Sequence, residues 1–374
     1  MQFYITLTTD CNMRCSYCYG KCSDDFGSDF SGLQIDYEVP SRIVYDIETL
    51  RSFCMSDQDL TLIFYGGEPL LETEILKKIM DTIPADRYMI QTNGLLLDSV
   101  EPRYANKFHT ILVSVDGDEK TTDKLRGNGT YRRVVENVKR LRQNGFEGEI
   151  IARMTVEKAT DIRGQVNWLL SNSECPFDSV HWQLDAMFWQ NDYDAPSFKK
   201  WMKESYTPSV NLLISDWVGH MQEYGEVQRI YPLIGVTQTL LSGQHEKLRC
   251  GAGWTTFNIQ TNGIITPCPV MAGLRDFYLG DIERTSAENL VNAVFPDEPC
   301  KNCNIGGLCG GRCLYANVTK LWGDEGFAMV CETVRNLVAS LEGVLPVIKH
   351  LVNVGTIAFE DFNYPRLNSC EIIP

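Results

Sequence analysis

Three cysteines near the start of the chain have a spacing that can bind a metal cluster. Cys11, Cys15 and Cys18 form a C-x3-C-x2-C loop directly after the apolar stretch 3–7. Three thiolates this close together can hold three corners of a four-iron cube and leave the fourth iron without a protein ligand. Such an open iron can bind a reactant. The alternative is a disulfide or a zinc site, for which Cys22 would be the fourth ligand.

A second group of cysteines lies in the C-terminal third of the chain. Fourteen cysteines in total, without an N-terminal export signal, indicate metal binding rather than disulfides. The sequence Thr261-Asn262-Gly263 between two apolar runs predicts a hairpin with a two-residue turn, which would bring the first two cysteines of the group to the same end of a β-ribbon. The group consists of Cys250, Cys268, Cys300, Cys303, Cys309, Cys313 and Cys331.

The elements that position these cysteines alternate between strand and helix. Short apolar runs predict strands at residues 3–7, 60–65, 87–91, 110–115, 149–156 and 179–184. Amphipathic patterns predict helices at 41–53, 72–83, 99–106, 131–144 and 163–170. Strands joined by crossover helices indicate an α/β fold with a parallel sheet, in which ligands collect at the C-terminal ends of the strands.

Polar segments follow three of these strands. Each is also an ordinary turn sequence, and the three are Gly66-Gly67-Glu68-Pro69, Gln91-Thr92-Asn93-Gly94 and Ser114-Val115-Asp116-Gly117. The two consecutive glycines permit close backbone approach to a ligand, and Glu68 can pair with an ammonium group. Asp116 and Asp185 are strand-end carboxylates that can accept a proton, with a structural role in a turn or a wall as the alternative.

The first cysteine loop, with Tyr17 before its last cysteine, and the GGEP segment resemble the radical S-adenosylmethionine (radical SAM) enzymes. The resemblance implies a partial (β/α)6 TIM-like barrel and a [4Fe-4S] cluster whose open iron binds S-adenosylmethionine. It also implies reductive cleavage of this cofactor to a 5′-deoxyadenosyl radical. The cofactor-binding residues that it implies are Tyr17, Gly66, Gly67, Glu68, Pro69, Gln91, Asn93, Ser114 and Arg153, with Arg126 as a second candidate arginine.

The order of the C-terminal cysteines resembles the SPASM extension of peptide- and protein-modifying radical SAM enzymes. This resemblance implies two auxiliary [4Fe-4S] clusters, and therefore three clusters in total. Auxiliary cluster I would take Cys250, Cys268 and Cys313, and auxiliary cluster II would take Cys300, Cys303, Cys309 and Cys331. Ten cysteines for twelve iron corners leave one vacancy for the cofactor and another on auxiliary cluster I. A substrate thiolate is the favoured ligand there; a non-cysteine ligand or a spare cysteine (Cys22, Cys54, Cys175 or Cys370) is the alternative.

The expected substrate is a peptide or protein, and the expected product is a thioether or carbon–carbon crosslink in a ribosomally made peptide. Side-chain oxidation, single-residue modification and a small-molecule substrate are the alternatives, with a non-enzymatic iron–sulfur electron carrier as the alternative of another class. Formylglycine formation is less favoured, because Pro269 stands where sulfatase-maturing relatives have an aspartate. The first strand begins by residue 3, so we expect no leader-recognition domain before it. Recognition would use the barrel, a separate leader-binding partner or no leader, and a flavodoxin- or ferredoxin-type protein would be the reductant.

Composition restricts the partners. The net charge is −15 and no basic cluster stands out, which argues against a nucleic-acid substrate. The chain has no apolar run of 18 residues and no signal peptide, so we expect a cytoplasmic protein that does not span a membrane. The predicted division is a barrel at 1–185, a helical bridge at 186–248, a SPASM domain at 249–335, and a C-terminal helix and tail at 336–374. Five aromatic residues of the bridge are expected in helix cores: Trp189, Trp201, Tyr206, Trp217 and Tyr224.

Overall fold

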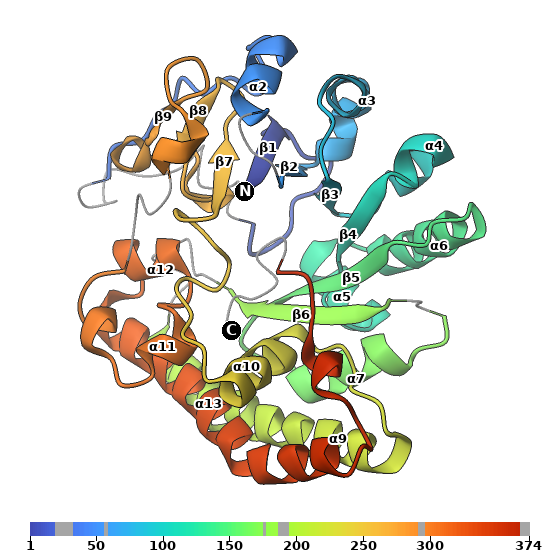
Figure 1. Ribbon diagram of the computed structural model, residues 1–374, viewed down its shortest axis with the longest axis vertical. Helices are drawn as coiled ribbons and strands as arrows, with labels where there is room; N and C mark the ends of the chain where they lie inside the picture. Colours follow the sequence, from blue (N-terminus) through green and yellow to red (C-terminus); the bar gives the residue numbers. More distant parts are fainter. Residues whose placement is uncertain (19–32, 56–58, 175–176, 186–193, 291–295, 367–374) are drawn as a thin grey trace.

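A single nine-stranded sheet forms the centre of the protein (Figure 1). The computed structural model describes residues 1–18, 33–55, 59–174, 177–185, 194–290 and 296–366. The strand order is β6-β5-β4-β3-β2-β1-β7-β8-β9, and β1 to β6 are parallel. These six strands are β1 (Gln2–Thr8), β2 (Thr61–Gly66), β3 (Arg87–Thr92), β4 (Phe108–Ser114), β5 (Glu149–Val156) and β6 (Ser179–Leu184). The prediction of a six-stranded parallel sheet in a partial barrel is confirmed.

Side chains of the strands alternate between two cores. Phe3, Ile5 and Leu7 face the helices that cover the outside of the sheet, whereas Tyr4 packs in the interior of the barrel with Ile63. The helices that connect the strands are α2 (Ile47–Cys54), α3 (Thr73–Thr82), α4 (Pro102–Ala105), α5 (Glu119–Arg126), α6 (Thr130–Gln143) and α7 (Ile162–Ser171). Both faces of the parallel strands are therefore buried, as their continuous apolar sequences require.

Strands β7 (Thr256–Ile259), β8 (Ile264–Thr266) and β9 (Gly280–Asp281) extend the sheet beyond β1. β7 pairs in parallel with β1, and β7 and β8 form the predicted antiparallel hairpin. The amide of Gln260 donates to the carbonyl of Ile264 at 2.9 Å, so three residues rather than the predicted two lie between them. Gly263, with φ 83°, supplies the left-handed residue that a three-residue hairpin loop needs.

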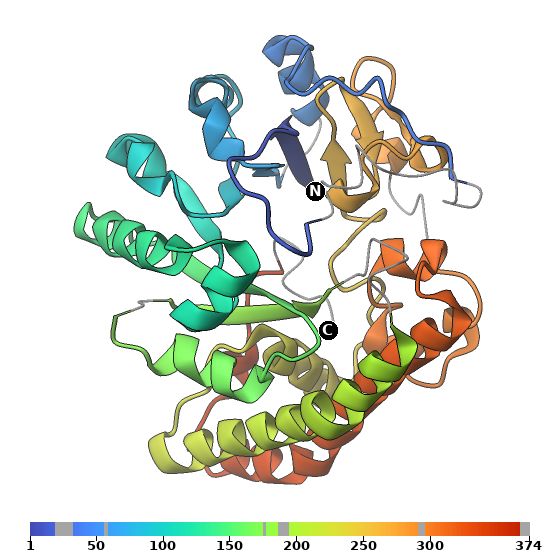
Figure 2. The same cartoon turned by 180° about the vertical axis from the view of Figure 1, so that it is seen from behind.

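A layer of helices packs beside the barrel (Figure 2). The long helices α9 and α13 run side by side, and the helices of this part are α8 (Ala195–Trp201), α9 (Thr207–Tyr224), α10 (Tyr231–Ser242), α11 (Gly306–Cys309), α12 (Leu314–Thr319) and α13 (Gly323–Asn353). Trp201, Tyr206 and Trp217 are buried as predicted. The prediction for Tyr224 is wrong, because this residue ends α9 and is 63% exposed. Trp189 lies outside the described residues.

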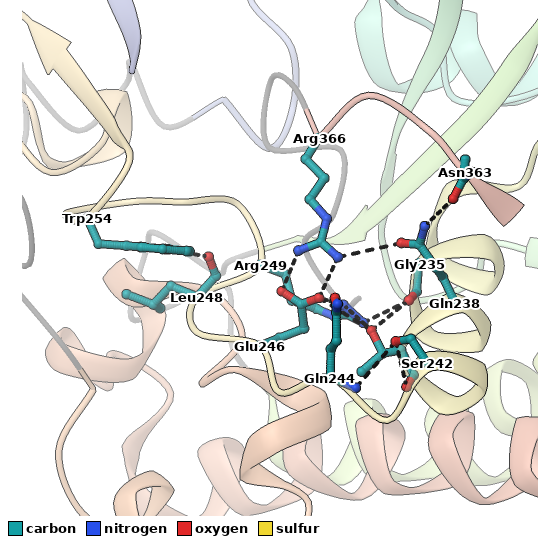
Figure 3. A network of polar contacts seen from close by, with 11 residues as sticks. Gly235, Gln238, Ser242, Gln244, Glu246, Leu248, Arg249, Trp254, Asn363 and Arg366 are labelled. Atoms are coloured by element: carbon teal, nitrogen blue, oxygen red, sulfur yellow. Dashed lines mark hydrogen bonds and ion pairs between the residues drawn. The ribbon is translucent and has the colours of Figure 1, made fainter. Parts of the chain in front are cut away.

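The C-terminal segment returns to the body of the protein. Phe362 is fully buried and its ring lies 6.1 Å from that of Trp217 in an edge-on contact. Figure 3 shows the end of the segment, where the Arg366 guanidinium forms an ion pair of 2.6 Å with the buried carboxylate of Glu246. The C-terminal tail therefore packs back on the core as far as Arg366. Within the described residues, no helix has the length and apolar character to cross a membrane.

Candidate active site

The cysteine loop begins directly after β1 and contacts α5. The Ser16 amide donates to the carbonyl of Leu125 at 2.9 Å, and the Met13 amide lies 3.4 Å from the Cys11 sulfur. Burial raises the pKa of the Cys15 thiol to about 11, opposed by the charge of Arg126 and assisted by Cys18. Burial also raises the pKa of Cys11, with a contribution from Cys18. The three thiols therefore lie close enough to influence one another.

Gly66 and Gly67 let the end of β2 approach the start of this loop. A Cβ atom on Gly66 would lie 2.2 Å from the carbonyl oxygen of Thr8, and one on Gly67 would lie 2.3 Å from that of Asp10. The amides of Gly67 and Glu68 donate to the same two carbonyls at 2.8 and 2.9 Å. We expected the glycines to make room for a ligand; in the structure the group that they accommodate is the chain's own backbone immediately before Cys11.

Glu68 is fully buried and bridges β2 to the end of β3. Its carboxylate accepts hydrogen bonds from the amide of Leu70 at 3.0 Å, the hydroxyl of Thr92 at 2.8 Å and the amide of Asn93 at 2.7 Å. Burial raises its pKa to about 7, although these hydrogen bonds act in the opposite direction. The Asn93 side chain continues the connection by donating to Asn12 at 2.7 Å, beside the Cys11 sulfur. Pro69, the last residue of the GGEP segment, is buried at the start of a short 3-10 helix.

Asp116 joins the end of β4 to both the cysteine loop and α5. Its carboxylate accepts two hydrogen bonds from the Arg126 guanidinium, of 2.7 and 3.0 Å. It also accepts one from the Tyr17 hydroxyl at 2.8 Å and one from the Thr155 amide at 2.9 Å. Burial disfavours the charge of Arg126, but the Asp116 carboxylate outweighs burial and raises its pKa. These four donors occupy the acceptor positions of the carboxylate.

The remaining predicted site residues lie along neighbouring strands. Ser114 and Arg153 are paired in the ladder between β4 and β5, and the Arg153 guanidinium donates to the Gln183 side chain at 2.8 Å. Gln91 lies in β3, and the amide of Asp185 at the end of β6 donates to the carbonyl of Val156 at 3.0 Å. The structure thus brings the segments after β1, β2, β3 and β4 together, while Arg153 and Asp185 lie on the adjoining strands.

The C-terminal cysteines form two groups that meet at Cys313. Burial raises the pKa of Cys268, and Cys313 and Cys250 raise it further, so these three thiols are close together. A separate cavity is lined by five of the predicted cysteine ligands: Cys300, Cys303, Cys309, Cys313 and Cys331. Among the described side chains, no three His, Cys, Asp or Glu residues are arranged around one metal ion. A four-iron cluster is a larger centre than a single ion, and the all-thiol donor sets have the chemistry that it requires.

Several contact residues were missed by the sequence analysis. Arg312 lines the same cavity from a position between two of the motif cysteines, and Asn317 and Arg335 donate to the sulfurs of Cys300 and Cys303. A charged residue inside a dense cysteine motif is the signal for Arg312. Asn317 follows Cys313 by four residues, which places both on one face of a helical turn.

Residues 5–159 match the family model of the Radical SAM superfamily. The chain contains a radical SAM domain. Such domains use a [4Fe-4S] cluster and S-adenosylmethionine, and the matched range includes the loop of Cys11, Cys15 and Cys18.

The similarity extends beyond the radical SAM domain. A cysteine-type anaerobic sulfatase-maturating enzyme of Clostridium novyi is 23% identical over 335 residues, which are 82% of this chain and 85% of the relative. The fold resembles that of native anSMEcpe with bound AdoMet and Cp18Cys peptide, with a TM-score of 0.66 at 19% identity over 93% of this chain and 99% of the other. It also resembles that of Streptococcus suis SuiB bound to its precursor peptide SuiA, with a TM-score of 0.54 at 15% identity over 85% and 72% of the two chains.

Proposed function

We propose that this radical SAM enzyme modifies a peptide or protein, and that its product is a thioether or carbon–carbon crosslink in a ribosomally made peptide. The observation that carries the proposal is the extent of the similarity. The similarity covers 82% of this chain for the sulfatase-maturating relative and 93% and 85% for the solved structures, which is more than the barrel alone, and these structures include one with a bound Cp18Cys peptide and one with a precursor peptide. Side-chain oxidation remains the second candidate, because a sulfatase-maturating enzyme is among the relatives.

The cofactors of this proposal are S-adenosylmethionine and three [4Fe-4S] clusters. Reductive cleavage of the bound cofactor supplies a radical that removes hydrogen from an unactivated carbon. Cys11, Cys15 and Cys18 would hold the first cluster, and Asn93, Ser114 and Arg153 are the nearby polar groups that would orient the cofactor. The burial of both faces of the sheet supports the exclusion of water from this chemistry.

We assign different roles to the two candidate carboxylates. Asp116 already accepts four hydrogen bonds from the protein, so we propose that it positions the cysteine loop through Tyr17 and does not take a proton from substrate. Asp185 lies partly buried at the C-terminal end of β6 and remains the proposed base. Arg126 is likewise assigned to Asp116, which leaves Arg153 as the proposed arginine for the cofactor carboxylate.

The second vacancy belongs to the group of Cys250, Cys268 and Cys313. Cys250 also lines a cavity of about 310 Å³, together with residues at the starts of β1 and β7 such as Gln2 and Thr256. We retain a substrate thiolate as the proposed ligand. Of the spare cysteines, Cys54 is fully buried in the core at the end of α2, which supports a packing role for it, whereas Cys22, Cys175 and Cys370 lie outside the described residues. A variant without all four spare cysteines should still coordinate an added thiol; if it does not, the proposal of an open site fails.

The test starts from anaerobically purified protein. Iron and sulfide content should be about twelve per chain, and one EPR signal of the reduced state should change when S-adenosylmethionine is added. Peptides encoded beside the gene are then incubated with enzyme, cofactor and a flavodoxin- or ferredoxin-type reductant, with and without candidate leader-binding proteins. A peptide product that is lighter by two hydrogens and in which fragmentation by mass spectrometry shows two residues joined, formed together with 5′-deoxyadenosine, supports crosslinking; the same mass loss confined to one residue supports side-chain oxidation. About four irons per chain, or zinc at the C-terminal cysteines, would overturn the assignment of the auxiliary clusters.

A further inference from the structure

We propose that Arg312, assisted by Arg335 and Asn317, raises the reduction potential of the cluster held by Cys300, Cys303, Cys309 and Cys331. This inference rests on the proposed function, because it requires an iron–sulfur cluster at these cysteines. It adds a property of the chain that the cysteine pattern does not contain. The residues involved are not cluster ligands, and they act on the cluster through charge and hydrogen bonds.

Arg312 occupies an unusual position in the cysteine cavity. It lies between Cys309 and Cys313, and its guanidinium carbon is 5.3 Å from the centroid of the Trp322 ring. Its Nε atom is buried without a hydrogen-bond partner among the described residues. A buried guanidinium that lacks a full set of acceptors is costly unless an anion accompanies it. A thiolate-ligated iron–sulfur cluster in the same cavity would supply that negative charge.

The backbone at Arg312 adds a second argument. Its φ angle is 58°, in the left-handed region that glycine adopts readily and that is strained for residues with a Cβ atom. The two preceding residues, Gly310 and Gly311, also have positive φ angles, so the segment turns tightly between its cysteines. An arginine at this strained position keeps its guanidinium beside the thiols, which a glycine there would not do.

Two further donors point at the cysteine sulfurs. The side-chain amide of Asn317 lies 2.9 Å from the Cys300 sulfur, and the Arg335 guanidinium lies 3.3 Å from the Cys303 sulfur. Reduction adds one negative charge to a cluster. A fixed positive charge or an N–H donor beside the sulfurs therefore stabilises the reduced form more than the oxidised form, and the reduction potential rises.

The N-terminal cysteine loop has less positive electrostatic surroundings. Its neighbouring cation, Arg126, is paired with the Asp116 carboxylate, and Glu68 is a second acidic group near Cys11. The side-chain amide of Asn93 is 3.9 Å from the Cys11 sulfur, a longer contact than those at Cys300 and Cys303. The inferred order of potentials is therefore low at the barrel and higher at the C-terminal cavity, which suits an electron-accepting role for the C-terminal cluster.

The test is a redox titration of the fully loaded enzyme monitored by EPR. Arg312→Gln should shift the midpoint potential of one cluster signal to a more negative value and leave the other signals in place. Cys303→Ala identifies that signal by removing it. Arg312→Lys retains a positive charge and should recover part of the shift. Arg132→Gln, at an exposed pair with Glu119 far from the cysteines in sequence, is the matched control and should shift nothing.

The outcomes separate this inference from the proposed function. Wild-type protein with about twelve irons and an unchanged potential in Arg312→Gln would overturn the inference alone. Wild-type protein with about four irons would overturn the auxiliary clusters themselves. If Arg312→Gln does not load iron, the other two donors decide: Arg335→Gln, at an exposed residue, and Asn317→Ala, at a buried one, should each give a smaller negative shift. An unchanged potential in both of these variants would also overturn the inference.

Discussion

The carboxylate of Asp116 and the guanidinium of Arg126 form a buried pair with two hydrogen bonds of 2.7 and 3.0 Å. The Asp116 side chain is fully buried and that of Arg126 is nearly so. The pair connects the end of β4 to the last turn of α5, and Tyr17 attaches the cysteine loop to it. The position of the loop relative to the sheet therefore depends on this pair.

Replacement of Asp116 by asparagine should destabilise the protein strongly. The substitution leaves the Arg126 charge buried without its partner, a change that costs about 3–5 kcal/mol in the free energy of unfolding. Chemical denaturation of the two proteins measures the difference. Glu119→Gln, on the same helix, is the control, because Glu119 and its partner Arg132 are both exposed. Equal effects of the two substitutions would show that the buried pair does not hold the loop.

The cysteines should separate into independent iron sites. Cys15→Ala should lower the iron content from about twelve to about eight per chain and abolish cleavage of S-adenosylmethionine. Cys303→Ala should lose a similar amount of iron but retain cleavage. Iron analysis and the yield of 5′-deoxyadenosine test both variants. Loss of all iron in Cys15→Ala would contradict the division of cysteines between the two ends of the chain.

Gly67→Ala should disrupt the junction between β2 and the cysteine loop. The added methyl group would lie 2.3 Å from the carbonyl oxygen of Asp10, and backbone cannot move aside as a flexible side chain can. We expect a loss of about 1–3 kcal/mol in stability and weaker iron loading. Gly219→Ala in α9 is the control, since nothing lies within 4 Å of the added atom and alanine favours a helix by about 0.5–1 kcal/mol. A neutral Gly67→Ala would disprove the close approach.

The pair of Asp216 and Arg163 should make a pH-dependent contribution to stability. Hydrogen bonds from Arg163, of 2.6 and 3.0 Å, lower the pKa of Asp216 in the folded protein. Its contribution is therefore complete above the unfolded pKa of about 3.9 and is lost as the pH falls through the lower folded value. Thermal unfolding should be measured from neutral pH down to pH values near 3. The difference in Tm between wild type and Asp216→Asn should be constant at first and should then decrease. A difference in Tm that increases in acid would contradict the lowered pKa of Asp216.

Two phenylalanines of the C-terminal segment should contribute very differently to the stability of the protein. Phe362 is fully buried, so Phe362→Ala should cost about 3–5 kcal/mol in the free energy of unfolding. Phe359, at the other end of the same 3-10 turn (Phe359–Phe362), is 37% exposed, and its replacement should change stability by much less. Denaturation curves of both variants make the comparison. Similar small effects would mean that the segment is not part of the core.

The sequence predicted the sheet better than it predicted the helices. The strands are short runs of apolar residues, and the predicted range 149–156 coincides with β5. The helix predicted at 41–53 begins only at Ile47, because Asp46 caps it. Helix α5 was missed, because its sequence is mostly polar and only Thr122, Leu125 and Arg126 are buried. An element with so little apolar periodicity is set by tertiary contacts rather than by its own pattern.

The site residues that belong to recognisable sequence motifs could be predicted from the sequence. Cysteine spacing and the GGEP segment placed the right parts of the chain at the ends of the strands. The partners of these residues were not visible, because the bond from Tyr17 to Asp116 joins residues 99 positions apart. Likewise, the close contact of Gly67 with Asp10 depends on how β1 and β2 lie in the sheet. Such contacts follow from the fold and have no local pattern.

The parallel pairing of β7 with β1 fixes the distance between the two groups of cysteines. The N-terminal cysteine loop follows β1, while Cys250 and Cys268 lie on either side of the hairpin that β7 begins. Four residue pairs, from Gln2 with Thr256 to Ile5 with Ile259, fasten one strand to the other. The backbone hydrogen bonds of this strand pair therefore set the separation of the two cysteine groups. Clusters bound at the two groups, as proposed, would therefore lie at a separation that the sheet sets, so substitutions beside the cysteines could alter the potential of either cluster without changing the distance between them.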